Sequence, residues 1–229
     1  MTTYPDLASV ASLIAEPARA SMLSALLGDI ALPAGELARL AKVTPQTASA
    51  HLAKLVEGNL LSVTALGRHR YFRLRDKNVA QVLEALALIA RPARVDSLND
   101  SLQRSAIQRA RTCYDHLAGV LGVELTQAMM NNGYIQYHGE AYEVTPPGET
   151  WFSSFGVDCS ELQQKRRTFA RSCLDWSERK PHMAGALGAA ILHRMLELKW
   201  ILRVRGSRTV KVTDLGCQQL QNEFGLDWK

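Results

Sequence analysis

Residues 44–58 have a helical pattern with one apolar face and one polar face that carries few charges. Thr44 is a favourable N-cap and Pro45 a favourable first helical residue, so the helix has a defined start. The apolar stripe is formed by Ala48, Leu52, Leu55 and Val56. The rest of the surface carries Gln46, Thr47, Ser49, Ala50, His51 and Lys54. A helix that merely faces water would more often carry Glu and Lys, whereas small hydrogen-bonding side chains suit contact with base edges.

A basic hairpin is predicted directly after this helix. Two runs with β propensity, residues 60–66 and 70–75, flank a turn at residues 67–69 that contains Gly67. Five of the residues from 68 to 77 are basic and one is acidic: Arg68, Arg70, Arg73, Arg75 and Lys77 against Asp76. A polar helix followed by a basic hairpin predicts a winged helix, whose helix enters the major groove while its wing meets phosphates. The alternative is a small α+β module that binds a protein partner.

We therefore expect double-stranded DNA to be a partner. The expected contact residues are Thr44, Gln46, Thr47, Ser49, Ala50, His51 and Lys54 on the helix, with Arg68, His69 and Arg70 on the wing. The charge distribution agrees with this expectation. Residues 1–95 hold 11 basic and 7 acidic side chains, whereas residues 96–229 hold 16 and 15, so most of the net charge of +5 lies in the first part.

The early helix, the polar helix and the entry to the wing resemble the ArsR/SmtB family of winged-helix regulators. The resemblance covers about residues 5–92 and is carried by residues 18–26, by residues 44–55 with Ser49, His51, Leu52 and Leu55, and by residues 58–61. It implies a homodimeric repressor that binds an inverted-repeat operator and releases DNA when it senses a signal. The metal sites of the metal-sensing members are not expected, since residues 36–41 hold no Cys and residues 79–89 no His.

A second helix pattern in this part is apolar almost all round. It spans residues 79–90 and ends before the Pro92 that breaks it. An isolated domain would expose this surface as an apolar patch. We therefore expect it to form a homodimer interface with Leu7, Val10, Leu13 and Ile14 of an N-terminal helix.

The chain of 229 residues is expected to form two domains, residues 1–95 and 96–229. The fold class is mainly α with short β-hairpins (α+β). After helices at 107–119 and 123–133, a hairpin at 134–144 and a long helix at 181–198, a second basic hairpin covers 200–213. The second domain is thus expected to be winged-helix-like. Because the helix before its hairpin is mostly apolar, a sensory or scaffolding role is favoured over a second DNA reader. Certain longer ArsR-like regulators carry a C-terminal region similar to residues 111–119 and 173–185.

Two segments of the second domain hold Cys and His at close spacing. Cys113 and His116 are expected on one helix face, and Cys173 and His182 near the start of another helix. If the segments pack together, the four residues suit Zn or a softer metal. They could instead be a redox-active thiol group, or simply structural. Cys159, expected in a loop, is a further redox candidate that could pair with Cys173.

Other functional classes find little support. The sequence contains no glycine-rich phosphate loop, no His-Glu-x-x-His and no Gly-x-Ser-x-Gly, so no enzyme is expected; Cys113 with His116 is the one nucleophile–base candidate. No transmembrane segment or signal peptide is predicted, so a cytoplasmic protein without membrane contact is expected. Its effector, whether a small molecule, a metal or an oxidant, is not identified by these patterns.

Overall fold

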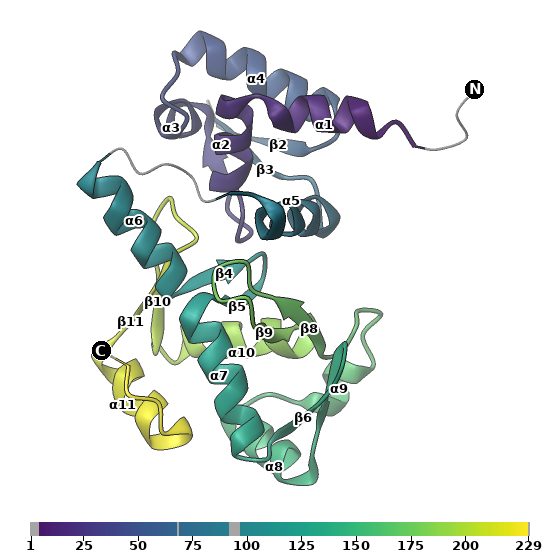
Figure 1. Ribbon diagram of the computed structural model, residues 1–229, viewed down its shortest axis with the longest axis vertical. Coiled ribbons are helices and arrows are strands. Elements are labelled where there is room, and N and C mark those ends of the chain that lie inside the picture. Colours follow the sequence, from purple (N-terminus) through teal and green to yellow (C-terminus); the bar gives the residue numbers. More distant parts are fainter. Residues whose placement is uncertain (1–4, 68, 92–96, 229) are drawn as a thin grey trace. The chain divides into compact units, whose positions relative to one another are not determined.

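The computed structural model describes residues 5–67, 69–91 and 97–228 (Figure 1). The chain divides into two compact units, Met1–Leu86 and Ala87–Lys229, and each unit is described by itself. The predicted domain boundary at 95/96 falls among residues outside the described ranges. None of the described helices is long and apolar enough to cross a membrane.

The N-terminal unit is a winged helix. Its elements are α1 (Leu7–Ala15), α2 (Pro17–Ala25), β1 (Leu32–Pro33), α3 (Ala34–Leu40), α4 (Pro45–Glu57), β2 (Leu61–Leu66), β3 (His69–Leu74) and α5 (Lys77–Ile89), the last of which crosses the division between the units. The strands form one antiparallel sheet in the order β1-β3-β2. The predicted polar helix and hairpin are confirmed as α4 and the β2–β3 pair.

Local sequence signals explain where these elements begin and how they pack. Thr44 caps α4, since its hydroxyl accepts a hydrogen bond from the Thr47 backbone N–H at 3.2 Å. The register from Leu61↔Leu74 to Leu66↔His69 places Leu61, Phe72 and Leu74 in the core. They are buried with Leu residues of α2, α3 and α4: Leu23, Leu37, Leu52 and Leu55.

The C-terminal unit contains fourteen described elements. They are α6 (Leu98–Arg109), β4 (Arg111–Cys113), β5 (His116–Ala118), α7 (Gly119–Asn131), β6 (Ile135–His138), β7 (Ala141–Val144), α8 (Pro146–Phe155), α9 (Cys159–Gln163), β8 (Arg171–Leu174), β9 (Pro181–Ala184), α10 (Gly185–Glu197), β10 (Ile201–Arg203), β11 (Val210–Val212) and α11 (Asp214–Phe224).

These elements include two copies of one arrangement. The first copy runs β4-β5-α7-β6-β7-α8 and the second runs β8-β9-α10-β10-β11-α11; in both, a hairpin is followed by a helix, a second hairpin and a second helix. The central helices both have thirteen residues and begin with a glycine at positive φ. The last helices are capped alike, by Thr145 on the Gly148 N–H and by Thr213 on the Gly216 N–H. In each copy a helix is followed by a hairpin, the same order as α4 and the β2–β3 hairpin in the N-terminal unit.

The two copies contact each other through paired strands and through each central helix. β7 of the first copy pairs with β8 of the second through Ala141↔Arg171, and Arg111 of β4 forms a bridge with Thr209, which precedes β11. Each central helix also contacts the first hairpin of the other copy, α7 against β9 and α10 against β5. The Met183 N–H of β9, for example, donates to the Thr126 hydroxyl of α7 at 2.9 Å. The copies therefore share one core.

Two helix predictions in this unit are wrong. Residues 107–119 were expected to be one helix, but α6 ends at Arg109 and the β4–β5 hairpin follows. The helix expected at 181–198 begins only at Gly185, after β9. The short strands β4 and β5 are buried at every position, so they lack the alternation of polar and apolar residues that identifies a strand in sequence.

Candidate DNA-binding surface and candidate metal centre

The predicted groove-facing residues lie on the exposed side of α4. Thr44, Gln46, Thr47, Ser49, Ala50 and Lys54 are all exposed, and Ala48, Leu52 and Leu55 form the buried side. The Thr44 and Thr47 hydroxyls lie 2.9 Å apart, and the Ser49 hydroxyl donates to the Pro45 carbonyl at 2.9 Å. Gln46, with an amide that both donates and accepts, is the side chain of this set best suited to reading a base.

His51 is oriented differently from the rest of the set. Its side chain is only 17% exposed, and its Nε2 lies 3.6 Å from Oε2 of Glu16. Glu16 also caps α2 by accepting a hydrogen bond from the Arg19 N–H at 2.8 Å. His51 therefore packs toward the start of α2, which places it at the edge of the candidate DNA-binding surface.

The wing, formed by β2 and β3, follows α4 along the chain and carries exposed basic side chains. His69, Arg70, Arg73 and Arg75 are exposed, while Phe72 and Leu74 between them are buried. The Arg75 guanidinium donates to the Asn59 side chain at 2.7 Å, which ties the base of the wing to the end of α4. Arg68, predicted as a wing contact, lies outside the described residues.

The C-terminal unit brings together the four predicted metal ligands. Cys113 lies opposite His116 across the β4–β5 hairpin, and Cys173 lies opposite His182 across the β8–β9 hairpin. One ligand atom of each residue lies within 4.8 Å of the ligand atoms of the other three. The two Sγ atoms are 4.0 Å apart and the two Nε2 atoms 3.1 Å apart. The prediction placed these residues on helices, but the hairpins bring them together.

A carboxylate stands beside each of the two imidazoles. Asp115 Oδ1 lies 3.3 Å from Nδ1 of His116, and the Arg167 guanidinium donates to both Asp115 oxygens. Asp175 Oδ2 lies 3.9 Å from Nδ1 of His182. Asp175 is itself held by the buried Arg111 guanidinium at 2.8 Å and by the Gly119 N–H at 2.7 Å. Nδ1 of His116 is thus hydrogen-bonded to an acid, Nδ1 of His182 lies near an acid without a hydrogen bond to it, and the two Nε2 atoms face each other.

The electrostatics of the cluster favour charged forms. The hydrogen bond with Cys113 and those with His116 and His182 outweigh burial and place the pKa of the Cys173 thiol well below its ordinary value. Burial lowers the pKa of His116, but its hydrogen bonds to Asp115 and Cys173 outweigh burial, and the net shift is upward. Burial raises the pKa of Asp115, yet hydrogen bonds from His116 and Arg167 bring it down to about 2.

Comparison with known proteins identifies the class of the chain. Residues 14–64 match the family described as a helix-turn-helix domain. The chain is 47% identical over 212 residues to the HTH-type transcriptional regulator YdfF of Bacillus subtilis (strain 168), which covers 93% of this chain and 94% of the relative. The chain belongs to the family of helix-turn-helix transcriptional regulators.

Solved structures of shorter proteins are also similar to part of this transcriptional regulator. NolR from Sinorhizobium fredii is 26% identical, covering 41% of this chain and 100% of its own, with a TM-score of 0.35. The cadmium metal-sensor CMTR from Mycobacterium tuberculosis is 31% identical, covering 40% of this chain and 94% of its own, with a TM-score of 0.33. The family confirms the regulator with a DNA-binding helix-turn-helix that the sequence predicts.

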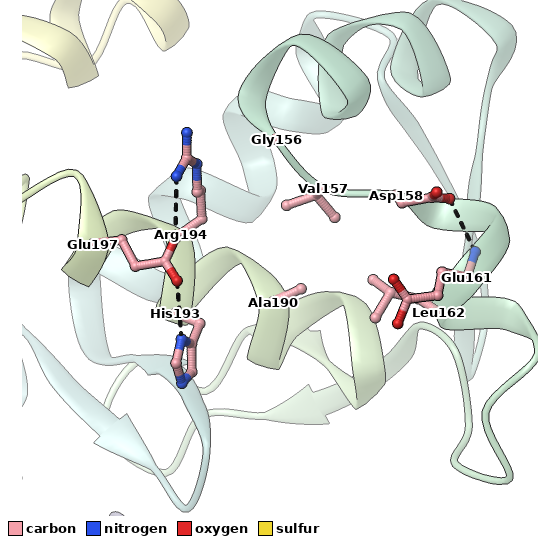
Figure 2. A pocket seen from close by; sticks show the side chains of 9 residues that line it. All are labelled: Gly156, Val157, Asp158, Glu161, Leu162, Ala190, His193, Arg194 and Glu197. Carbon is pink, nitrogen blue, oxygen red and sulfur yellow. Dashed lines mark hydrogen bonds and ion pairs between the residues drawn. The ribbon is translucent and has the colours of Figure 1, made fainter.

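The regulator has a further pocket near the C-terminal end of α10 (Figure 2). Its volume is about 200 Å³, and its lining includes Asp158 and Glu161 on one side with His193, Arg194 and Glu197 on the other. Figure 2 shows the charged groups of α10 bound to one another, with Glu197 between Arg194 and His193. Because His193 is 81% and Glu197 56% exposed, this pocket is an open surface hollow.

Cys159 does not belong to the Cys/His cluster of the regulator. It was expected in a loop, but it is the first residue of α9 and is buried in the core of the C-terminal unit. Burial, together with the nearby Glu149 and Asp158 carboxylates, raises the pKa of its thiol to about 11. The fourth cysteine, Cys217, is half-buried on α11.

Asp175 is grouped with Cys173 and His182 by the sequence, but sequence reasoning gave Arg111, Asp115 and Arg167 no role at the cluster. An internal repeat could have revealed Arg111 and Asp115, since Arg111, Cys113 and Asp115 recur as Arg171, Cys173 and Asp175. A second part of the repeat follows, in which residues 116–122 and 182–188 share His, Ala and two Gly at the same relative positions. A repeat of this kind indicates that both hairpins have the same architecture.

Proposed function

We propose that this regulator is a homodimeric repressor that binds an inverted-repeat operator through α4 and the wing of each copy. The observation that carries the proposal is the exposed face of α4, which offers small, mostly uncharged hydrogen-bonding groups beside an exposed basic wing. The groups on α4 can distinguish bases in the major groove, and the basic wing can contact phosphates whatever the base sequence. A protein-interaction module would not need this division of chemistry.

The dimer is supported by exposed apolar side chains on α1 and α5. Leu7 is 75% exposed on α1, and Val82 and Leu86 on α5 are 49% and 39% exposed. A second copy of this chain is the proposed occupant of this surface, since an inverted-repeat operator requires two equivalent reading helices.

The C-terminal unit is proposed to carry the response to an effector. Besides the Cys/His cluster, it has a cavity of about 560 Å³ lined by Ala106, Arg109, Val204, Val210, Cys217 and Trp228. Its size and partly apolar lining suit a small organic molecule. The Arg109 guanidinium lies over the Trp228 ring, 4.8 Å from its centre, so one end of the cavity carries a positive charge.

Selection of DNA ligands from a random duplex pool tests the proposal. Full-length protein is expected to enrich an inverted repeat whose half-sites lie about one helical turn apart. Gln46→Ala should then weaken binding to the selected duplex by about 1–3 kcal/mol and barely change binding to a scrambled duplex. Gln218→Ala, at an exposed position of α11, is the matched control. Failure to enrich any duplex, or equal losses on both duplexes for Gln46→Ala, would contradict the proposal.

A further inference from the structure

We propose that Cys113, His116, Cys173 and His182 bind one Zn²⁺ ion between the two copies of the duplicated C-terminal unit. The inference deepens the effector response proposed above by naming its chemistry. It rests on the proposed function only for its regulatory consequence, because metal binding by this cluster is a separate property of the C-terminal unit.

The distance between the two sulfurs and the distance between the two imidazole nitrogens are close to those of a tetrahedral site. With Zn–S bonds of about 2.3 Å and Zn–N bonds of about 2.05 Å, a tetrahedron has edges of about 3.8 Å between sulfurs and about 3.3 Å between nitrogens. The observed separations are 4.0 Å for the Sγ atoms of Cys113 and Cys173 and 3.1 Å for the Nε2 atoms of His116 and His182. All four ligand atoms lie within 4.8 Å of one another, so binding an ion at the centre would draw sulfur and nitrogen atoms closer together.

The donor set and its burial define the kind of metal. Two thiols and two imidazoles favour Zn²⁺ and softer ions over Mg²⁺ or Ca²⁺, which prefer oxygen. His116 and His182 are 2% and 1% exposed and Cys113 is 5% exposed, so solvent reaches the cluster mainly at the half-buried Cys173. Four protein ligands leave no position for water or substrate, which is typical of structural or regulatory zinc and not of catalytic zinc.

A neighbouring acid orients one of the two imidazoles for this purpose. In zinc sites, a ligating histidine usually gives its other ring N–H to a carboxylate, which fixes the ring and increases its basicity. Asp115 stands in this position toward His116, at 3.3 Å from Nδ1. Asp175 Oδ2 lies 3.9 Å from Nδ1 of His182, too far for a hydrogen bond, so this buried Nδ1 has no hydrogen-bond partner among the described residues. Arg167 and Arg111 hold these two acids in place.

The duplication gives the ion a mechanical role. Each copy supplies one Cys and one His from its first hairpin, and β5 of one copy contacts β9 of the other (Figure 1). A metal ion bound to all four would cross-link β4 and β5 to β8 and β9 at the centre of the unit. Its loss should weaken the packing between the copies, so metal binding should stabilise the C-terminal unit.

Two metal-free states compete with this proposal. In a hydrogen-bonded cluster, one imidazole donates its Nε2–H to the other and both cysteines stay reduced. In a disulfide between Cys113 and Cys173, the sulfurs must move from 4.0 Å to about 2.05 Å, and an oxidant such as a peroxide must accept two electrons. Both states lack a bound ion, so metal content separates them from the proposed site.

The test uses full-length protein purified under reducing conditions and measures bound metal by native mass spectrometry. One Zn²⁺ per chain is expected. After removal of zinc with a chelator, Co²⁺ should restore one ion per chain and give the intense visible bands of a tetrahedral site with thiolate charge transfer. Zinc should also raise the unfolding temperature. A chain with no zinc that gives no tetrahedral Co²⁺ spectrum would overturn the proposal.

Three variants locate the site. Cys113→Ser should lose the Co²⁺–thiolate absorption in part and bind zinc at least tenfold more weakly, while Cys217→Ser, a cysteine outside the cluster, should match the unaltered protein. Asp115→Asn keeps every ligand and should weaken zinc binding about 10- to 100-fold, so it tests the site if Cys113→Ser does not fold. Equal zinc affinity in all variants would overturn the proposal. Selection of DNA with the same preparations shows separately whether the proposed DNA binding holds.

Discussion

His51 illustrates what a single residue adds to a helical pattern. Its place on the polar face of α4 groups it with Gln46 and Ser49 in the sequence, yet its ring packs toward Glu16. Its partner is thirty-five positions earlier in the chain, and no local pattern predicts that contact. Gln46, Thr47 and Ser49 are exposed on α4 and remain among the residues expected to meet the bases.

At the same scale, Cys159 should be chemically inert in the folded protein. With the pKa of its thiol raised to about 11, only about one molecule in a thousand carries the thiolate at pH 8. Burial further hinders a reagent, and the thiolate is the form that reacts. Iodoacetamide at pH 8 followed by peptide mass spectrometry should find Cys159 unmodified in native protein and modified in urea. Rapid alkylation of native Cys159 would show that the thiol is accessible and would revive its pairing with Cys173.

The wing is the element whose role can be measured without knowing the operator. Arg70 is exposed on β3, and each phosphate contact contributes about one unit to the dependence of log affinity on log salt. Arg70→Ala should therefore lower that slope by about one and weaken binding to specific and random duplexes alike. The measurement is fluorescence anisotropy over a series of salt concentrations.

The second hairpin supplies a matched control for this experiment. Arg205 is exposed in the turn between β10 and β11 of the C-terminal unit. Because the C-terminal unit is expected to sense and not to read DNA, Arg205→Ala should leave the salt slope unchanged. An equal reduction for both variants would mean that both hairpins meet phosphates.

Two glycines near helix starts differ in the space available for a Cβ atom. A Cβ at Gly216, near the start of α11, would lie 2.0 Å from the Trp200 carbonyl oxygen, so Gly216→Ala should destabilise the C-terminal unit by about 1–3 kcal/mol. A Cβ at Gly35 on α3 would meet nothing within 4 Å, and Gly35→Ala should stabilise the N-terminal unit by about 0.5–1 kcal/mol.

Urea titrations can separate these two effects. All four tryptophans, Trp151, Trp176, Trp200 and Trp228, lie in the C-terminal unit, so their fluorescence reports its unfolding. Gly216→Ala should shift the fluorescence midpoint to lower urea, whereas Gly35→Ala should leave it in place and shift only the circular-dichroism signal. A fluorescence midpoint unchanged by Gly216→Ala would contradict the packing described for α11.

An element is predicted well from sequence when its own residues carry the cap and the apolar periodicity that define it. α4 has a cap, periodic apolar residues and a clear end, and it was predicted within one residue at each end. β4 and β9 were not predicted because nearly all of their residues are buried, so their sequences show no alternation of polar and apolar positions. For the proposed metal ligands, the sequence predicts the four residues but not the hairpins that place each Cys opposite its His.

For the whole molecule, the proposed dimer predicts that a charge on α5 separates the copies. Val82 is 49% exposed, so Val82→Glu costs little in one chain but would bury a carboxylate in the interface. Sedimentation velocity at micromolar concentration should show a monomer for this variant and a dimer for the unaltered protein. Leu202→Glu, at a position 48% exposed on β10, should remain dimeric. A monomeric unaltered protein would contradict the interface.

The most direct test of the whole account is the mass of the protein bound to its selected duplex. Native mass spectrometry under reducing conditions should show two chains, one duplex and two Zn²⁺ ions in a single species. A complex of two chains and one duplex without zinc would leave the DNA-binding regulator standing and remove the metal centre. A species with one chain, or no species with DNA at all, would contradict the central claim that two copies of this chain read one operator through α4 and the wing.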